Sequence, residues 1–137
     1  VLSHVHRGTP QRPGLVLGLE SGGSCVGMAY RVPLDLRDEV MAYLRARELV
    51  TSVYLERSLP VRLASGKTVD AVCYTVDRRH AQYAGHLGEA EAAAIVRGAV
   101  GQSGRNEDYV ESAVAHFAAL GIRDPWMEAV AALLPKI

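Results

Sequence analysis

The chain has 137 residues, of which 49% are hydrophobic, and it carries 15 basic and 15 acidic side chains. A net charge of zero argues against nucleic acid or an anionic membrane surface as a partner and favours a small neutral or zwitterionic ligand. The length fits one domain with an adequate core. No apolar run reaches the roughly 20 residues that span a bilayer, and no leader-like segment opens the chain, so we expect a cytoplasmic protein.

The first half of the chain is predicted to be mostly β-structure. Two apolar runs flank the turn sequence Ser21-Gly22-Gly23, which is typical of a β-hairpin. Further strand-like runs follow, and Ser65-Gly66 predicts a turn before the strongest of them. The predicted strands are residues 14–20, 24–32, 52–59, 60–63 and 69–76.

A helix is predicted between the second and third of these strands, from about Leu36 to Glu48. Its apolar residues recur at a spacing that places them on one face, which should be buried. Asp35 is the predicted N-cap, and acidic residues fill the first turn, where they complement the helix dipole. The apolar face consists of Leu36, Val40, Tyr43 and Leu44.

Helices dominate the second half. An alanine-rich stretch spans residues 87–100, and a second helical pattern runs from about residue 107 to 120, with Asn106 as its N-cap and Gly121 as its stop. A last helix is predicted from Asp124 onwards. Strands followed by helices indicate an α+β fold, as a small barrel or a strongly bent sheet with the helices beside it.

Glu48 lies where the apolar stripe of the first helix ends in charge. At about 100° per residue, Arg47 falls near the middle of the stripe and Glu48 on its flank beside Leu44. Glu39 falls roughly 180° from Glu48, so these two carboxylates do not form an obvious pair. Because burying an unpaired charge is costly, Arg47 and Glu48 either mark the helix end, reach solvent or occupy a polar pocket in the core. Only the third alternative makes Glu48 a candidate acid or base.

The cysteines and histidines give no clear sign of redox or metal chemistry. Cys25 and Cys73 lie in apolar, strand-like segments without CxxC spacing, so we expect buried structural thiols, although a disulfide between them remains an alternative. His4 and His6 have no third ligand nearby in the sequence. We therefore expect no metal.

Three polar, glycine-bearing loops are candidate binding loops: residues 6–10, 82–85 and 101–106. The third opens directly into a helix, so its backbone amides and Arg105 are suited to a carboxylate. The alternative is structural, with glycine for the turn and Asn106 for the cap. Tyr109, one turn into that helix, is either a core residue with its hydroxyl satisfied by a neighbour or a substrate contact.

Nucleophile and metalloprotease signatures are absent from the sequence, so chemistry would depend on a carboxylate. An ordered set of motifs nevertheless resembles the ChaC family of glutathione-specific γ-glutamylcyclotransferases over nearly the whole chain. These motifs are His-Arg-Gly-Thr-Pro (6–10), Pro-Gly-Leu-Val-Leu-Gly-Leu (13–19), Gly-Met-Ala-Tyr-Arg-Val-Pro (27–33), the helix segment ending in Arg-Glu (39–48), Gln-Tyr-Ala-Gly (82–85) and Ser-Gly-Arg-Asn-Glu-Asp-Tyr (103–109).

The resemblance implies cleavage of glutathione to 5-oxoproline and cysteinylglycine without cofactor or metal. The family's catalytic glutamate corresponds to Glu48, which would take a proton from the substrate's α-amino group and return one to the departing amine. Such a base needs a raised pKa, so Arg47 should point away from it or have another partner. The candidate substrate-binding residues are Tyr109, Glu39, Arg7 and Gly8.

One family feature has no counterpart in this chain, a first strand that carries a Tyr-Gly-Ser-Leu motif. We therefore expect a single ChaC-like domain, residues 1–137, without that strand. Unpaired strand edges would favour a homo-oligomer or complementation by the missing N-terminal segment. The missing strand and the family's older label of cation-transport regulator leave a regulatory or binding module as one alternative function. A cyclotransferase acting on another γ-glutamyl substrate is a second alternative.

Overall fold

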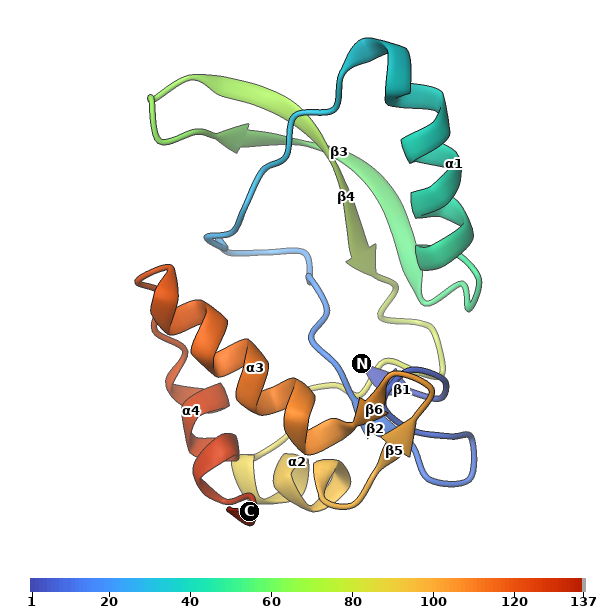
Figure 1. The fold of residues 1–137 in the computed structure, drawn as a ribbon, viewed down its shortest axis with the longest axis vertical. Helices are drawn as coiled ribbons and strands as arrows, with labels where there is room; N and C mark the ends of the chain where they lie inside the picture. Colours follow the sequence, from blue (N-terminus) through green and yellow to red (C-terminus); the bar gives the residue numbers. More distant parts are fainter. Residues whose placement is uncertain (137) are drawn as a thin grey trace. The chain divides into compact units, whose positions relative to one another are not determined.

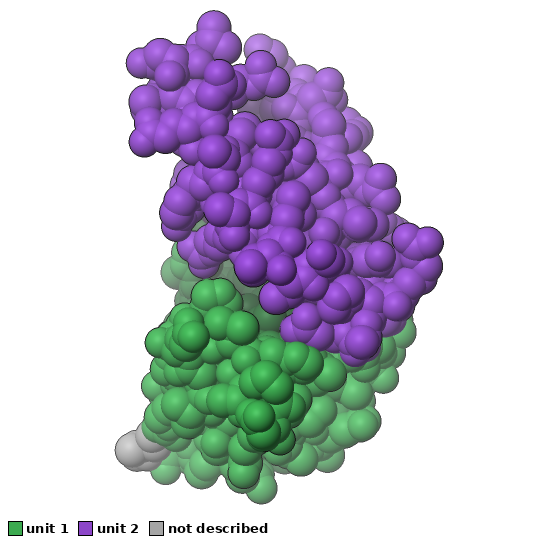
Figure 2. Space-filling view, turned by 90° about the vertical axis from the view of Figure 1, so that its right-hand side faces the viewer, with its two compact units in different colours: residues 1–17, 84–137 green, residues 18–83 purple. Residues whose placement is uncertain are grey.

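A computed structural model describes residues 1–136 and divides the chain into two compact units, coloured separately in Figure 2. Unit 1 combines residues 1–17 with the chain from residue 84 onwards, and unit 2 consists of residues 18–83. The α+β class is confirmed, but the described residues form three separate two-stranded sheets rather than a closed barrel. None of the helices within residues 1–136 is long and apolar enough to cross a membrane.

Two short antiparallel sheets belong to unit 1. Strand β1 (Leu2–Ser3) pairs with β2 (Gly14–Leu15), and β5 (Val100–Gly101) pairs with β6 (Gly104–Arg105). Gly104 has a φ of +106°, a conformation that favours glycine, so it allows the tight turn between β5 and β6. The third candidate loop is therefore a β-hairpin that leads into a helix.

Three helices complete unit 1: α2 (Glu89–Val96), α3 (Asn106–Ala119) and α4 (Pro125–Ala132). Helix α4 packs against both α2 and α3, and α2 also packs against β2 (Figure 1). Their apolar faces, joined by β2, enclose a core in which even the alanines are almost fully inaccessible. The core residues are Leu15, Ala92, Ala93, Val96, Val110, Met127, Val130 and Leu134.

The ends of α3 and α4 follow the sequence signals. Gly121 has a φ of +72°, and its amide donates to the carbonyl of Ala118. The amide of the next residue, Ile122, donates to the carbonyl of Phe117 at 2.8 Å. This pair of bonds is the Schellman arrangement, which satisfies the last carbonyls of a helix. At the start of α4 the Asp124 carboxylate accepts from the amide of Met127 at 3.0 Å. The predicted stop at Gly121 is therefore confirmed, α4 starts where the sequence predicted, and the structure adds Asp124 as its N-cap.

Unit 2 contains one long hairpin and one helix. Strands β3 (Tyr54–Arg62) and β4 (Thr68–Val76) pair antiparallel along their whole lengths. A one-turn 3-10 helix, η1 (Leu34–Leu36), precedes α1 (Arg37–Glu48). Helix α1 has no buried residue, in contrast to the helices of unit 1. Contacts made by partly or fully exposed side chains must therefore hold α1 in place.

The predicted hairpin over residues 14–32 is wrong. Strand β2 is only two residues long and pairs with β1, while residues 20–33 form no regular strand. Leu19 instead makes a single parallel bridge with Thr75 of β4. The local apolar pattern carried no information on the partner, because strand pairing is decided by distant segments.

The two predicted strands at 52–59 and 60–63 are one continuous strand, β3. Proline lacks an amide donor, but each strand of a two-stranded sheet is an edge strand, so Pro60 is tolerated opposite Asp70. The division at proline in the sequence was therefore wrong.

Three predictions about side chains in unit 2 also fail. Asp35 lies within η1, and the N-cap of α1 is Leu36, without a side-chain cap bond. The predicted buried face of α1 is largely accessible, with Tyr43 61% exposed. Cys25 is exposed and Cys73 is partly buried, and both are free thiols. The helical period identified a shared face correctly, but period alone does not supply a partner to cover it.

Candidate active site

Glu48 is the last residue of α1. The last hydrogen bond of the helix runs from the backbone amide of Leu49 to the carbonyl of Arg45, and Ser52 then adopts a φ of +58° before β3 begins. A serine in this left-handed region is uncommon and marks a tight connection. The Glu48 side chain is 30% exposed, so its carboxylate is accessible to a ligand without being fully solvated.

Arg47 has two neighbours. Its Nε lies 3.6 Å from Glu48 Oε1, and its Nη1 donates to the Tyr43 hydroxyl at 3.4 Å. The Tyr43 contact is the largest of the effects that raise the pKa of Arg47 above its usual value. Arg47 therefore finds the second partner expected from the sequence, while it stays within ion-pair distance of Glu48.

A second carboxylate, Glu56 on β3, lies in a dense polar cluster that sequence reasoning missed. Arg45 of α1 contacts it with both ends of its guanidinium, Nε to Oε1 at 2.9 Å and Nη2 to Oε2 at 3.1 Å. The Tyr74 hydroxyl of β4 donates to Oε1 at 2.8 Å. Glu56 and Tyr74 are direct cross-strand partners, so the β3–β4 register brings them together. The only sequence signal was the alternation along the two strands.

The pKa shifts of Glu56 and Tyr74 follow from these hydrogen bonds and from burial. The hydrogen bond from Arg45, followed by that from Tyr74, lowers the pKa of Glu56. Burial, and then the bond to Glu56, raises the pKa of Tyr74 to about 12, and the charge of Glu48 contributes in the same direction. Glu48 thus lies within electrostatic reach of Tyr74.

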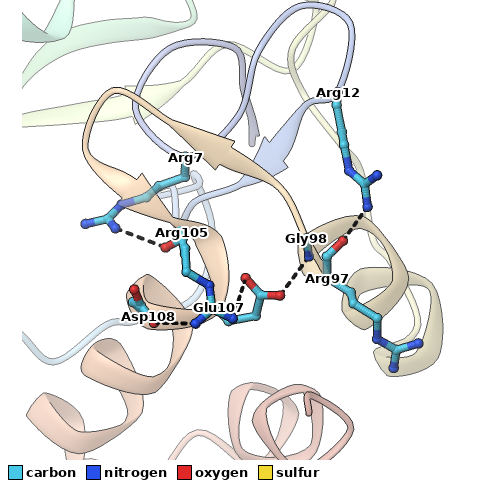
Figure 3. Close-up of polar contacts among 7 residues, drawn as sticks. All are labelled: Arg7, Arg12, Arg97, Gly98, Arg105, Glu107 and Asp108. Carbon is cyan, nitrogen blue, oxygen red and sulfur yellow. Dashed lines mark hydrogen bonds and ion pairs between the residues drawn. The ribbon is translucent and has the colours of Figure 1, made fainter. Parts of the chain in front are cut away.

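In unit 1, Arg7 and Tyr109 are in contact. The Arg7 guanidinium lies over the Tyr109 ring, 5.5 Å from its centroid. Its Nη1 donates to the Arg105 carbonyl at 3.1 Å (Figure 3). The Tyr109 hydroxyl accepts from the amide of Leu17 at 2.9 Å, and burial raises its pKa. The Tyr109 proton is therefore retained at neutral pH, and a hydroxyl that accepts one bond can still donate another.

Two of the three candidate loops meet in unit 1. The amides of Gln102 and Ser103 donate to the carbonyls of Val5 and His6, at 2.8 and 2.9 Å. The His6 ring and the Ser103 hydroxyl are also 2.9 Å apart. A Cβ on Gly101 would lie 2.5 Å from the Val5 and His6 carbonyl oxygens, so this approach requires glycine. These two loop amides thus bind protein carbonyls. Of the remaining loop, 82–85, the Tyr83 hydroxyl donates to Glu20 within unit 2 at 2.7 Å.

The prediction that Asn106 caps α3 is wrong, because Asn106 is the first residue of the helix and its side chain points elsewhere. Its Oδ1 accepts from the amide of Leu15 and its Nδ2 donates to the carbonyl of Leu15, both at 2.7 Å. Asparagine is equally suited to both roles, and the partner is far away in sequence.

Glu107 follows on α3 and is almost completely buried. Its Oε1 accepts from the Gly98 amide at 2.7 Å, and its Oε2 lies 3.7 Å from Arg105 Nη2 without a hydrogen-bond partner (Figure 3). Burial acts to raise the pKa of Glu107, but the Gly98 amide and the charge of Arg105 outweigh it and leave the pKa lowered. Glu107 is thus a buried anion that ties the start of α3 to the end of α2.

The remaining predicted residues have clear positions. A Cβ on Gly8 would collide with the backbone of Gly14 and Ser3, so glycine is required for close packing there. Glu39 is exposed in the first turn of α1, nine residues and therefore about 180° from Glu48. Within residues 1–136, no group of three potential ligands could hold a metal ion. The substrate-binding roles of Gly8 and Glu39 stay predictions.

The fold is shared with solved proteins. Two crystal structures of a γ-glutamylcyclotransferase specific to glutathione from yeast match 97% of this chain, with TM-scores of 0.76 and 0.74 at 19% and 21% identity. The chain covers 80% and 82% of those structures. At this identity the likeness establishes the fold.

The sequence establishes the family. The profile of the ChaC-like protein family matches residues 1–136, and the chain belongs to that family. The glutathione-specific γ-glutamylcyclotransferase of Escherichia coli K12 is 33% identical over 118 residues, 86% of this chain and 51% of that protein. Glutathione-specific γ-glutamylcyclotransferase 1 of Danio rerio is 31% identical over 109 residues, 77% and 56% of the two chains. The chain thus spans about half the length of these relatives.

Proposed function

We propose that the chain is a γ-glutamylcyclotransferase that cleaves glutathione to 5-oxoproline and cysteinylglycine. One observation carries the proposal: Glu48, with a partly accessible carboxylate, ends α1 in a chain that matches the ChaC-like family over residues 1–136. By the motif resemblance, Glu48 corresponds to the family's catalytic glutamate. The names of the E. coli and Danio rerio relatives support the choice of glutathione as substrate.

In the proposed reaction Glu48 is the general acid and base. The substrate's α-amino nitrogen attacks the γ-carbonyl carbon, and Glu48 takes a proton from that nitrogen as the new C–N bond forms. The bond to the cysteine nitrogen then breaks, and Glu48 returns the proton to the departing amine. No water is consumed, and the products are a five-membered lactam and a dipeptide. Proton transfer of this kind typically contributes roughly 10²–10⁴-fold to the rate.

Arg7 and Tyr109 are proposed to bind the substrate through its charged and carbonyl groups. The Tyr109 hydroxyl already accepts from Leu17, so its proton is directed to another acceptor. Arg7 has one Nη1 bond to Arg105, which leaves other guanidinium donors for a carboxylate. Gly8 and Glu39 stay in the proposal as substrate-binding residues on the strength of the family motifs.

The decisive experiment is to incubate the chain with glutathione and to measure 5-oxoproline and cysteinylglycine. We expect turnover by the native chain and a loss of at least about 100-fold in Glu48→Gln. Asp38→Asn is the matched control, because Asp38 is an exposed carboxylate on the same helix. Similar rates for native chain and Glu48→Gln would refute the assigned base.

The same assay separates the alternatives. Faster release of 5-oxoproline from a different γ-glutamyl compound would change the substrate but keep the enzyme class. No turnover of any γ-glutamyl compound, together with binding to a protein partner, would favour the regulatory or binding module. A cytoplasmic location stays a prediction.

We also propose that the segment from Val26 to Leu36 is a contact surface, either for a second copy of the chain or for an N-terminal segment with the Tyr-Gly-Ser-Leu motif. Its apolar residues alternate along the chain and are exposed, with Tyr30 82% and Leu34 85% accessible. Alternation of this kind is typical of a strand with one covered face. Light scattering of the purified chain, with and without an added peptide carrying that motif, tests both partners.

A further inference from the structure

Arg45 and Arg47 both precede Glu48 on α1, and each has a partner other than Glu48. Arg45 lies three residues before Glu48, which places the two side chains as neighbours on the helix surface. A cation three residues before a carboxylate is close enough on the helix to pair with it. Arg45 instead makes its two-pronged contact with Glu56, while Arg47 divides its guanidinium between Tyr43 and Glu48.

Glu56 is held from two elements at once. Its Oε1 accepts from Arg45 Nε and from the Tyr74 hydroxyl, and its Oε2 accepts from Arg45 Nη2. Helix α1 has no fully buried residue, so its last turn has less apolar packing to hold it than the helices of unit 1 have. The bond from Arg45 to Glu56 joins that turn to the β3–β4 hairpin, and the cross-strand bond from Tyr74 keeps the Glu56 carboxylate in place.

We propose that Glu56 is a positioning residue for Glu48: it binds Arg45 and so prevents Arg45 from pairing with the base. This inference rests on the proposed role of Glu48 in proton transfer. A carboxylate paired with Arg45 would be stabilised as an anion and would be a weaker base. The short sequence Arg45-Ala46-Arg47-Glu48 brings two cations to the base, and Glu56 neutralises one of them.

The charge state of this network is constant near neutral pH. The lowered pKa of Glu56 keeps it anionic, and the pKa of Tyr74, about 12, keeps its hydroxyl protonated. The charged and titratable groups near Glu48 include Tyr43, Arg45 and Arg47 from α1, Glu56 from β3 and Tyr74 from β4. A change of pH dependence in a variant therefore reports on Glu48 itself.

The test uses two substitutions with opposite expected signs. In Glu56→Gln the freed Arg45 turns to Glu48, and the pH at which the Glu48 carboxyl carbon titrates in a ¹³C NMR spectrum should fall by about 0.5–1 unit. In Arg45→Met the Glu56 anion is left uncompensated, and the same midpoint should rise. The double variant should return to within about 0.3 unit of the native chain. If the Arg45–Glu56 ion pair had only a structural role, the two single variants would not shift the Glu48 midpoint in opposite directions.

Kinetics give a second readout. The acid limb of the pH profile of kcat should move with the NMR midpoint, and kcat of Glu56→Gln should fall several-fold, roughly 3- to 10-fold, with KM within about twofold. Glu128→Gln is the matched control, because Arg123 contacts Glu128 with the same two-pronged geometry at 2.7 and 2.7 Å in unit 1. It should shift neither readout.

The outcomes are separable from those of the proposed function. If the native chain turns over no γ-glutamyl compound, the proposed function fails, while the NMR midpoints still decide whether Glu56 holds Arg45 away from Glu48. An unchanged midpoint in Glu56→Gln, or shifts of one sign in both single variants, overturns the inference. Should Glu56→Gln fail to fold by circular dichroism, Tyr74→Phe replaces it, with a smaller downward shift expected and no shift overturning the inference.

Discussion

The side-chain amide of Asn106 binds both backbone polar groups of Leu15, at 2.7 Å each, across 91 positions of sequence. One helical turn further, the Tyr109 hydroxyl accepts from the amide of Leu17. Two side chains of α3 thus supply, to Leu15 and Leu17, the hydrogen bonds that a second neighbouring strand would otherwise give. Helix α3 therefore takes the place of a strand paired with Leu15 and Leu17.

We predict that Asn106→Leu destabilises unit 1 by about 2–4 kcal/mol, because the buried amide and carbonyl of Leu15 both lose their partner. Trp126, the single tryptophan, lies in α4 and reports on unit 1 by fluorescence during urea unfolding. Glu111→Gln, an exposed change on the same helix, should stay within about 0.5 kcal/mol of the native chain. An equally small effect of Asn106→Leu would show that Leu15 finds other partners.

Tyr109→Phe should have a small structural cost and a larger functional one. Leu17 is 40% exposed, so loss of the hydroxyl should reduce stability by about 1 kcal/mol or less. If the hydroxyl also donates to the substrate, KM for glutathione should rise severalfold while kcat changes less. Steady-state kinetics check this expectation, and an unchanged KM would exclude Tyr109 as a substrate contact.

Glu107 should make unit 1 sensitive to acid. Its folded-state pKa lies below the ordinary value of 4.5, so the stabilisation is present above that pH and is lost as the pH falls through the folded-state value. Trp126 fluorescence melts between pH 3 and pH 6 should therefore show a steep loss of stability at the acid end. Glu107→Gln should flatten this dependence, and a profile parallel to that of the native chain would contradict the assignment.

Gly14→Ala should disturb the same region by steric conflict. A Cβ at Gly14 would collide with the Arg7 carbonyl and approach Asn106 Oδ1 to 2.6 Å, so we expect a loss of about 1–3 kcal/mol. Gly88→Ala is the control, because nothing lies within 4 Å of a Cβ there and its φ is −68°. It should stay within about 1 kcal/mol of the native chain. Equal melting temperatures for the two variants would contradict the predicted collision.

Features that depend on a few consecutive residues could be predicted from the sequence. Asp124 with Pro125 at the start of α4, Gly121 at the end of α3 and the alternation of β4 each encode their own structure. The family motifs likewise located Glu48 at the end of a helix. These signals are local, and the folded chain preserves them.

Features that depend on distant partners could not be predicted. Asn106 fits a helix cap as well as it fits Leu15, and only the folded chain decides between them. The pairing of β2 with β1, and the meeting of Glu56 with Arg45 and Tyr74, likewise depend on tertiary contacts. The candidate base was therefore found from the sequence, whereas its polar surroundings were not.

The discontinuous make-up of unit 1 has a consequence for folding during synthesis. Residues 1–17 leave the ribosome early, but the α3 side chains that bind Leu15 and Leu17 are made about ninety residues later. At roughly 5–20 residues per second, this interval lasts on the order of 5–20 s. The hairpin of unit 2 has its partners close in sequence and can form within that time. Residues 1–17 must wait for the second half of the chain, and during this interval they are open to chaperones and to competing strands.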